Sequence, residues 1–209
     1  MPLPMVHFGV SHNLISVLKP RDVSLFYLGS VAPDAVHMRE NYTREDKNIS
    51  HLYDADMEVW RKNAIDFIIR SSKANDNGFY LSYGVHILTD IYWSETVLSM
   101  FKERYNEDKA PVQEGQWAYY NDTDRLDFEL HKKCEYSHEI WSYLLNCKNA
   151  GIDGLVSPHE VNLWKEQVLH WFDKGESKHK NKIKYVSLDD LTTFMMETTA
   201  RIRDVLFNS

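Results

Sequence analysis

The 209-residue chain has only two cysteines, Cys134 and Cys147. They do not form a CxxC pair, and if the segment between them is helical, a rise of about 1.5 Å per residue places them too far apart for a disulfide. Reduced thiols are typical of the cytoplasm. The N-terminal residues also lack the basic segment and the following apolar segment of a secretory signal. We therefore expect a cytoplasmic protein without disulfides.

A surplus of basic residues is absent too, and so is a long apolar run. The formal net charge is −7, whereas proteins that bind nucleic acids generally present a basic face, so we expect no nucleic-acid partner. No apolar stretch reaches the length of about 20 residues that a transmembrane helix requires, and we expect no stable insertion into a membrane. The lysine-rich segment 178–184 is interpreted as a solvated loop.

Strand patterns, internal repeats and low-complexity tracts are likewise missing from the sequence. The chain does have helical periodicity, a hydrophobic fraction of 43% and an aromatic fraction of 13%. Apolar residues recur at the three- to four-residue spacing of amphipathic helices, and a chain of this length can bury one sizeable core. We expect a single all-α domain over residues 1–209, built as a multi-helix bundle.

The expected helices cover residues 11–18, 21–31, 54–74, 79–105, 117–147, 157–172 and 187–206. The helix at 79–105 has a long apolar run and is expected to be central and largely buried. A polar run near 120–123 could interrupt the helix at 117–147. Ser157 and Pro158 resemble an N-cap followed by proline at the first helical position. Polar loops and a turn are expected at 39–50, 175–184 and 75–78.

The most informative segment is Tyr-Gly-Val-His-Ile-Leu-Thr-Asp-Ile-Tyr-Trp at 83–93, which places His86 and Asp90 four residues apart in an apolar and aromatic run. Residues four apart lie on one face of a helix, so the imidazole and the carboxylate can converge on one metal ion. Burying both groups without a partner would be costly. A hydrogen bond between the two side chains is the alternative interpretation.

Three other residues are candidate partners of this pair. His7 lies near the N-terminus, Asp34 follows an Ala-Pro turn, and His51 precedes the next helix. With the first pair they supply three imidazoles and two carboxylates, a ligand set that suits Zn, Mn or Fe. The alternatives are that Asp34 caps a helix and that His7 is an ordinary residue near a mobile terminus. His12 could take the place of His7. His37, three residues after Asp34, either approaches the site or faces solvent, and we favour solvent.

In their order along the chain, these segments resemble the zinc-dependent phospholipase C family, whose domain also forms the N-terminal part of glycosylphosphatidylinositol-specific phospholipase D. The resemblance rests on His7, the phrase Leu-Gly-Ser-Val-Ala-Pro-Asp at 28–34, His51 and the segment at 83–93. It covers about residues 1–95. It implies an all-α bundle with metal ions in a cleft between helices.

The resemblance also implies a role for each of the five residues. His86 and Asp90 would be metal ligands from the central helix, and Asp90 would bridge two ions. His51 would complete the shell of one ion, and His7 would serve the other. Asp34 would lie at the first ion, either as a ligand or as the catalytic base that acts on its water.

Two features of the secreted family members have no clear counterpart here. Their third metal is held by a further histidine and a His-x3-Glu pair, for which His131 with Glu135 and the neighbouring His138 with Glu139 are weak candidates. They also ligate a metal with the first residue of the mature chain, whereas six residues precede His7. We therefore expect at most two ions.

The expected function is a metal-dependent phosphoester hydrolase of the phosphodiesterase or phospholipase C kind, in which a metal-bound hydroxide attacks and Asp34 assists. The substrate would be a small phosphoester or a lipid headgroup, and the cofactor one or two divalent ions, foremost Zn. The alternative from another class is a non-catalytic helical binding module with a vestigial metal site. An HD-type phosphohydrolase ranks below both, because the chain has no adjacent His-Asp dipeptide.

Overall fold

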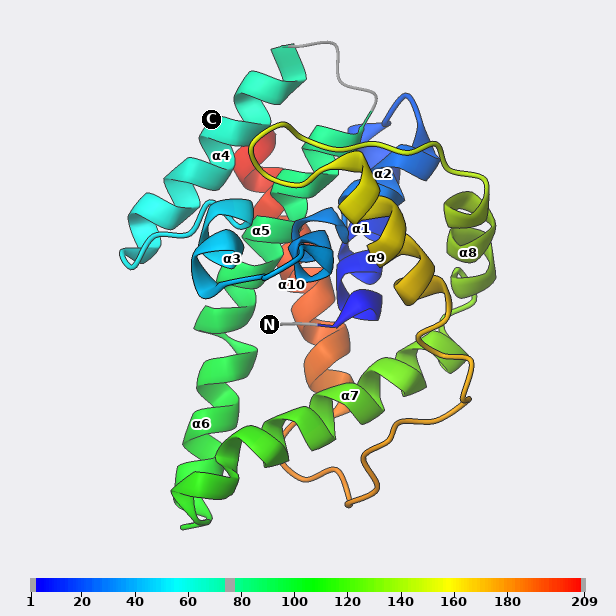
Figure 1. Ribbon diagram of the computed structural model, residues 1–209. Helices are drawn as coiled ribbons and strands as arrows, with labels where there is room; N and C mark the ends of the chain where they lie inside the picture. Colours follow the sequence, from blue (N-terminus) through cyan, green and yellow to red (C-terminus); the bar gives the residue numbers. More distant parts are fainter. Residues whose placement is uncertain (1–2, 74–77, 208–209) are drawn as a thin grey trace.

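The computed structural model describes residues 3–73 and 78–207, apart from the side chains of residues 71–73. Over these residues the regular secondary structure is helical, with one isolated bridge between Ile152 and Val156, which confirms the expected all-α fold (Figure 1). The elements are α1 (Pro4–Leu18), α2 (Val23–Gly29), η1 (Ala32–Met38), α3 (Arg44–Ser50), α4 (Met57–Lys73), α5 (Phe79–Glu95), α6 (Val97–Glu107), η2 (Val112–Glu114), α7 (Gly115–Lys133), α8 (Ser137–Leu145), α9 (Pro158–Leu169) and α10 (Leu188–Phe207).

Helix α5 is the centre of the molecule. Every residue from 82 to 93 is buried, and α1, α2, α4, α10 and η1 all pack against this helix. A helix that is apolar around its whole circumference is stable only when neighbours cover every face. The expectation of a central, buried helix is confirmed for this part of the chain, and it places His86 and Asp90 in the core.

Glycines allow α5 to approach its neighbours closely. A side chain at Gly29, the last residue of α2, would collide with Ser82 Oγ and with the carbonyl oxygen of Phe79. A side chain at Gly84 would collide with Ile68 of α4. The backbone that follows Gly29 therefore runs directly beside α5, which brings the carbonyl group of the next residue within reach of that helix.

The predicted helix at 79–105 is wrong in one respect, because the chain breaks between α5 and α6. Thr96 has φ −113° and ψ −82°, outside the helical region, and its hydroxyl donates a hydrogen bond to the carbonyl oxygen of Tyr92 at 2.7 Å. Such local side-chain bonds compete with continuation of a helix. Helix α6 continues from Val97 in the same general direction (Figure 1).

The polar run at 120–123 does not interrupt its helix, because α7 continues through those residues. The side chain of Asp122 accepts hydrogen bonds from the backbone N–H groups of Tyr185 at 2.6 Å and Val186 at 3.1 Å. These polar groups are therefore satisfied by a distant segment and do not disturb their own helix. The chain leaves the helical conformation later, at Cys134, before α8 begins.

Two N-terminal segments differ from the prediction. Helix α1 begins at Pro4 rather than residue 11, and its first eight residues are all buried, so no amphipathic pattern marks its start. The expected loop at 39–50 contains α3, which a capping box of Thr43 and Asp46 initiates.

The remaining boundaries agree more closely. Ser157 is confirmed as the N-cap of α9, although that helix ends at Leu169. Residues 175–184 form a loop as expected, whereas the turn at 75–78 lies mostly outside the described residues. Both cysteines are unpaired. Among the helices that the structure describes, not one combines the length and apolar character needed to cross a bilayer.

Candidate metal centre

The structure brings all five predicted site residues together from four elements. His7 lies in α1, Asp34 in η1, His51 directly after α3, and His86 and Asp90 in α5. The ligand atoms of His7, Asp34 and His86 lie within 4.8 Å of one another, and so do those of His51, His86 and Asp90. The side chain of Asp34 is 14% exposed and the other four are at most 3% exposed.

The two carboxylate oxygens of Asp90 face different histidines. Oδ1 lies 3.6 Å from Nε2 of His7, whereas Oδ2 lies 3.6 Å from Nε2 of His51 and 3.8 Å from Nε2 of His86. This arrangement allows one carboxylate to serve two neighbouring ions, as the family resemblance implies for Asp90. The alternative of a hydrogen bond between His86 and Asp90 does not fit, because 3.8 Å is beyond hydrogen-bond distance.

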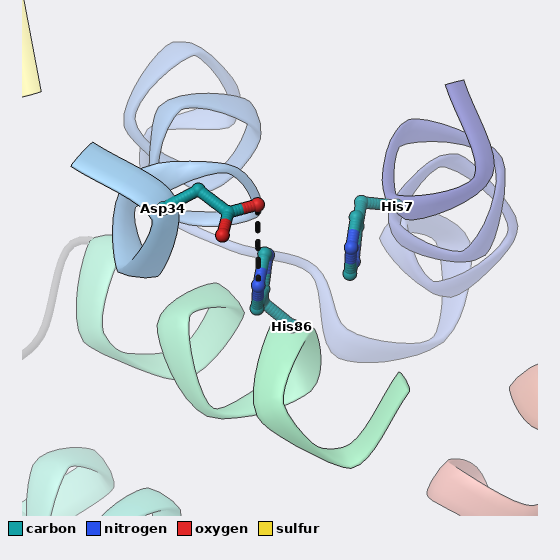
Figure 2. Close-up of side chains that lie close together, drawn as sticks. All are labelled: His7, Asp34 and His86. Carbon is teal, nitrogen blue, oxygen red and sulfur yellow. Dashed lines mark ion pairs between the residues drawn. The ribbon is translucent and has the colours of Figure 1, made fainter. Parts of the chain in front are cut away.

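Asp34 is the second carboxylate of the cluster, and its two oxygens face His51 and His86. Its Oδ1 lies 3.4 Å from Nε2 of His51, and its Oδ2 lies 3.9 Å from Nε2 of His86. In Figure 2, His86 lies between Asp34 and His7, with the two imidazole rings face to face. Asp34 lies within η1, at its third residue, and has no capping hydrogen bond to the backbone there. The interpretation of Asp34 as a simple helix cap is therefore not supported.

The ligand atoms lack hydrogen-bond partners within the described part of the chain. The buried atoms without a partner include both ring nitrogens of His7, Nε2 of His51 and His86, Oδ1 of Asp34 and both carboxylate oxygens of Asp90. More than nine in ten buried polar groups normally have a partner, and each one left unpaired costs about 1–3 kcal/mol. Seven such atoms in one cluster of five side chains fit bound cations better than they fit an ordinary core.

Backbone carbonyl groups orient two of the histidines. Nδ1 of His86 donates to the carbonyl oxygen of Ser30 at 2.8 Å, and Nδ1 of His51 lies 3.1 Å from the carbonyl oxygen of Lys47. A carbonyl oxygen can only accept, so the proton of His86 is on Nδ1. Nδ1 of His51 also lies 2.9 Å from Oγ of Ser50, whose hydroxyl donates to the carbonyl oxygen of Lys47 at 3.1 Å and can therefore accept from the ring. This pattern assigns the proton of His51 to Nδ1 as well. Each Nε2 therefore turns its lone pair to the centre, which is the arrangement typical of metal-bound histidines.

The imidazole of His7 stacks on that of His86, with ring centroids 3.8 Å apart and an angle of 3° between the planes. Burial and the nearby His86 lower the pKa of His7 well below its ordinary value. Burial also lowers the pKa of His86, although Asp90 and Asp34 oppose this effect. Both rings are thus kept neutral, which is the form that binds a metal ion.

The pKa values of the two carboxylates are shifted in opposite directions. Burial would raise the pKa of Asp34, but the contact with His51 and the electrostatic interaction with the His86 ring outweigh it and hold this pKa well below its ordinary value. Burial raises the pKa of Asp90 to about 6. Two carboxylates that share one site push their pKa values apart. A divalent cation between the two carboxylates would stabilise the ionised form of both.

Two further residues lie beside Asp34, one of which the sequence interpretation placed preferentially in solvent and one of which it missed. His37, expected to face solvent, has its Nε2 3.7 Å from Oδ1 of Asp34, and Nζ of Lys47 lies 3.9 Å from the same oxygen. Lys47 precedes His51, the C-cap residue of α3, by four residues, so the two lie about one helical turn apart. The sequence signal for this placement was the capping box at Thr43, which marks the start of α3.

His12 and the downstream histidines lie elsewhere. Nδ1 of His12 is 2.9 Å from the hydroxyl oxygen of Tyr27, and its ring stacks on Tyr136. His131 stacks on Phe172. Within the described residues, no histidine after His86 belongs to a group of three or more potential metal ligands.

The chain matches no protein-family model, no curated protein and no solved structure. The resemblance to the zinc-dependent phospholipase C family therefore stays a prediction from the sequence. What the centre can do chemically follows from its own ligand set. Three imidazoles and two carboxylates suit Zn, Mn or Fe more than Ca or Mg, which prefer oxygen ligands alone.

Proposed function

We propose that this chain is a metal-dependent phosphoester hydrolase of the zinc-dependent phospholipase C type. The observation that supports this best is the convergence of three imidazoles and two carboxylates, from four separate elements, on one point where their buried lone pairs have no described partner. A structural hydrogen-bond network would pair these atoms with one another. The order of the ligands along the chain supports the same family.

The residues divide into two sets around Asp90. Asp34, His51, His86 and Oδ2 of Asp90 would hold one ion, and His7 with Oδ1 of Asp90 would contribute to a second. Zn is the foremost candidate for this mixed nitrogen and oxygen set. When bound, such ions supply a Lewis acid for a phosphoryl group and lower the pKa of a coordinated water.

Asp34 has the role of the general base in this proposal. It is the most exposed of the five side chains, so it lies where water and substrate would enter. In the reaction the water oxygen forms a bond to phosphorus while the ester P–O bond breaks, and the carboxylate of Asp34 accepts the proton that the water loses. The departing alcohol takes up a proton from solvent. Ser30 and Lys47 assist through their carbonyl groups, which keep His86 and His51 oriented.

The second candidate function is a helical binding module that retains the metal without turnover. It is favoured by one observation: the described residues after Asp90 provide no further group of metal ligands. The secreted phospholipases, by contrast, hold a third ion with residues from that region. Both candidate functions include a bound metal ion, and only the first includes hydrolysis of a substrate.

Metal analysis combined with hydrolysis assays separates these functions. Purified protein and an Asp90→Asn variant would be analysed by mass spectrometry for bound metal and assayed on a panel of phosphomonoesters and phosphodiesters. We expect one or two zinc ions per wild-type chain, fewer in the variant, and a loss of at least 100-fold in kcat/KM, because the shared ligand of both ions is weakened. Asp204→Asn, on the exposed face of α10, is the matched control and should change neither value.

The outcomes distinguish the candidates clearly. Wild-type protein that contains no metal and takes up none from zinc buffer would contradict both. Bound metal without turnover across the whole panel would favour the binding module. Turnover that survives exhaustive removal of metal would exclude the proposed mechanism.

A further inference from the structure

Two side chains that are not candidate ligands lie beside Asp34, on the side where the centre is most exposed. They are the ammonium group of Lys47 and the imidazole of His37. Asp34 is the ligand nearest this side, and its neighbours Lys47 and His37 are 21% and 32% exposed. The remaining ligands are almost completely buried. Lys47 and His37 therefore lie beside Asp34 on the more exposed side of the centre.

Lys47 is placed so that its ammonium group can meet an anion at the centre. Its Nζ lies 3.9 Å from Oδ1 of Asp34, which is too long for a hydrogen bond, and it donates no hydrogen bond to any described residue. Its backbone carbonyl group meanwhile fixes His51, one helical turn further along α3. Once Asp34 ligates a metal ion, the ammonium group remains available for a negatively charged oxygen.

His37 is held beside Lys47 by aromatic neighbours. Its ring lies 4.7 Å from that of Tyr42 and 5.9 Å from that of Trp164, measured between centroids. Its Nε2 lies 3.7 Å from the same oxygen of Asp34 that Lys47 approaches. Two nitrogen groups from different elements, η1 and α3, thus face one carboxylate oxygen at the open side of the centre.

The other acidic groups that pack against η1 are engaged by an arginine. Asp46 of α3 and Glu160 of α9 both pair with Arg39, at 2.8 Å and 2.7 Å. Arg39 offsets one of these two negative charges and holds both carboxylates, which leaves Asp34 as the carboxylate that faces Lys47 and His37. With divalent ions bound, the centre and its open side would be positively charged as a whole.

This charge distribution favours a particular phosphate. A phosphomonoester carries nearly two negative charges at neutral pH and offers three terminal oxygens, whereas a phosphodiester carries one charge and offers two. Ions can contact two terminal oxygens, and the third then needs a donor from the protein. We infer, on the basis of the proposed metal-dependent hydrolysis, that Lys47 and His37 bind the terminal oxygens of a phosphomonoester and make the centre select monoesters over diesters. In this preference the chain would depart from the phospholipases that it resembles, which cleave diesters.

Phosphate binding tests this inference independently of turnover. Zinc-loaded protein would be titrated calorimetrically with inorganic phosphate, which resembles a monoester, and with dimethyl phosphate, which resembles a diester. Lys47→Met keeps the length of the side chain and removes its charge, and Lys47→Arg restores the charge. We expect Lys47→Met to weaken phosphate binding about 10- to 100-fold, with a much smaller effect on dimethyl phosphate. The metal content should be unchanged.

Additional variants complete the design. His37→Gln should weaken phosphate binding less than Lys47→Met, because it removes a neutral donor. Lys62→Met, at an exposed lysine of α4 that pairs with Asp66, is the matched control and should bind phosphate like the wild type. The same variants assayed with p-nitrophenyl phosphate and its bis ester should lose activity on the monoester selectively.

Each other result overturns the inference. Tight phosphate binding by zinc-loaded Lys47→Met would exclude the anion site while leaving the proposed function intact, and so would tighter binding of dimethyl phosphate than of phosphate by the wild type. Loss of metal from Lys47→Met would assign this lysine to the metal site itself. A wild-type protein that binds no metal would overturn both the inference and the proposed function.

Discussion

At the scale of single residues, the three histidines of the centre differ in how firmly their rings are fixed. His86 and His51 each bond a backbone carbonyl oxygen through Nδ1, at 2.8 Å and 3.1 Å. His7 has no such bond, and its orientation depends on stacking against His86. A ligand without a hydrogen bond at its second nitrogen is less strictly oriented. His7 is therefore the ligand that most depends on the position of its helix.

That helix is anchored by a carboxylate from the second half of the chain. Oδ1 of Asp127, in α7, accepts a hydrogen bond from the backbone N–H of Met5 at 2.9 Å, in the first turn of α1. No side chain of α1 itself caps this turn. Burial raises the pKa of Asp127 well above its ordinary value, although the bond from Met5 opposes this effect.

Replacing Asp127 with asparagine should stabilise the protein at neutral pH. The pKa of Asp127 is raised in the folded state, so its favourable contribution is complete below the unfolded value of about 4 and is lost as the pH rises through the folded value. Asparagine keeps the acceptor for Met5 and cannot ionise. Thermal melts of Asp127→Asn should therefore show a higher Tm than wild type at pH 8, with a difference that shrinks towards pH 4.

The exposed Asp173→Asn is the control for this comparison and should shift Tm little at either pH. A difference between Asp127→Asn and wild type that grows as the pH falls would contradict the assignment of a raised pKa to Asp127.

At the scale of elements, α3 shows how a short helix can set part of a site. It has seven residues, far fewer than the roughly 12–15 that an isolated helix needs to be even marginally stable in water. The hydroxyl group of Tyr83 in α5 donates to the carbonyl oxygen of Ser50, and Nε1 of Trp60 in α4 donates to that of His51. Tertiary contacts at its end and a capping box at its start therefore hold this helix.

Removing the cap at Thr43 should weaken zinc binding without touching any ligand. The hydroxyl oxygen of Thr43 accepts from the backbone N–H of Asp46 at 3.2 Å, and loss of such a cap costs about 1 kcal/mol. Since His51 follows the last turn of α3, we expect Thr43→Ala to lower zinc affinity by up to about fivefold. Competition with a chelating dye would measure this change.

Ser187 offers the matched control for this experiment. It forms the same capping arrangement with Asp190 at the start of α10, a helix that carries no proposed ligand. Ser187→Ala should lower Tm and leave zinc affinity unchanged. Equal losses of zinc affinity in both variants would show that global stability, and not the position of His51, controls metal binding.

The sequence of α3 favours a loop, although the segment is helical. Residues 39–50 are polar and lack the apolar stripe that identifies most helices. The spacing of Thr43 and Asp46 was the available evidence for a helix start. Because the polar composition of this segment predicts a loop, it does not indicate that Lys47 and His51 lie one helical turn apart. The predicted ligands, by contrast, needed only the four-residue spacing within α5 and the order of motifs along the chain.

At the scale of the whole molecule, the second half of the chain supports a centre built from the first half. All five candidate ligands precede residue 95, yet α7 anchors α1 through Asp127. Arg39, which follows η1, bonds the carboxylate of Glu160 in α9 and the carbonyl oxygen of Leu155. These later segments fix the positions of His7 and Asp34 without contributing a ligand.

Zinc should therefore rigidify one part of the molecule more than another. The proposed ligands join α1, η1, α3 and α5, and binding to the folded state alone stabilises the segments that it connects. Hydrogen exchange followed by mass spectrometry should show zinc-dependent protection in α1, η1 and α3, and little change in α8. Asp90→Asn should show no such protection, whereas equal protection along the whole wild-type chain would contradict a local centre.

The amino-acid sequence alone determined the helical fold class and the identity of the candidate ligands, because both depend on local spacing. Apolar periodicity specifies helices, and a separation of four residues places His86 and Asp90 on one face. Only the tertiary structure decided which polar groups surround that face. The approach of His37 and Lys47 to Asp34, the bond from Met5 to Asp127 and the pairing of Arg39 with Glu160 depend on how separate helices pack. No local pattern encodes that packing, since its energy comes from contacts between residues far apart in the chain.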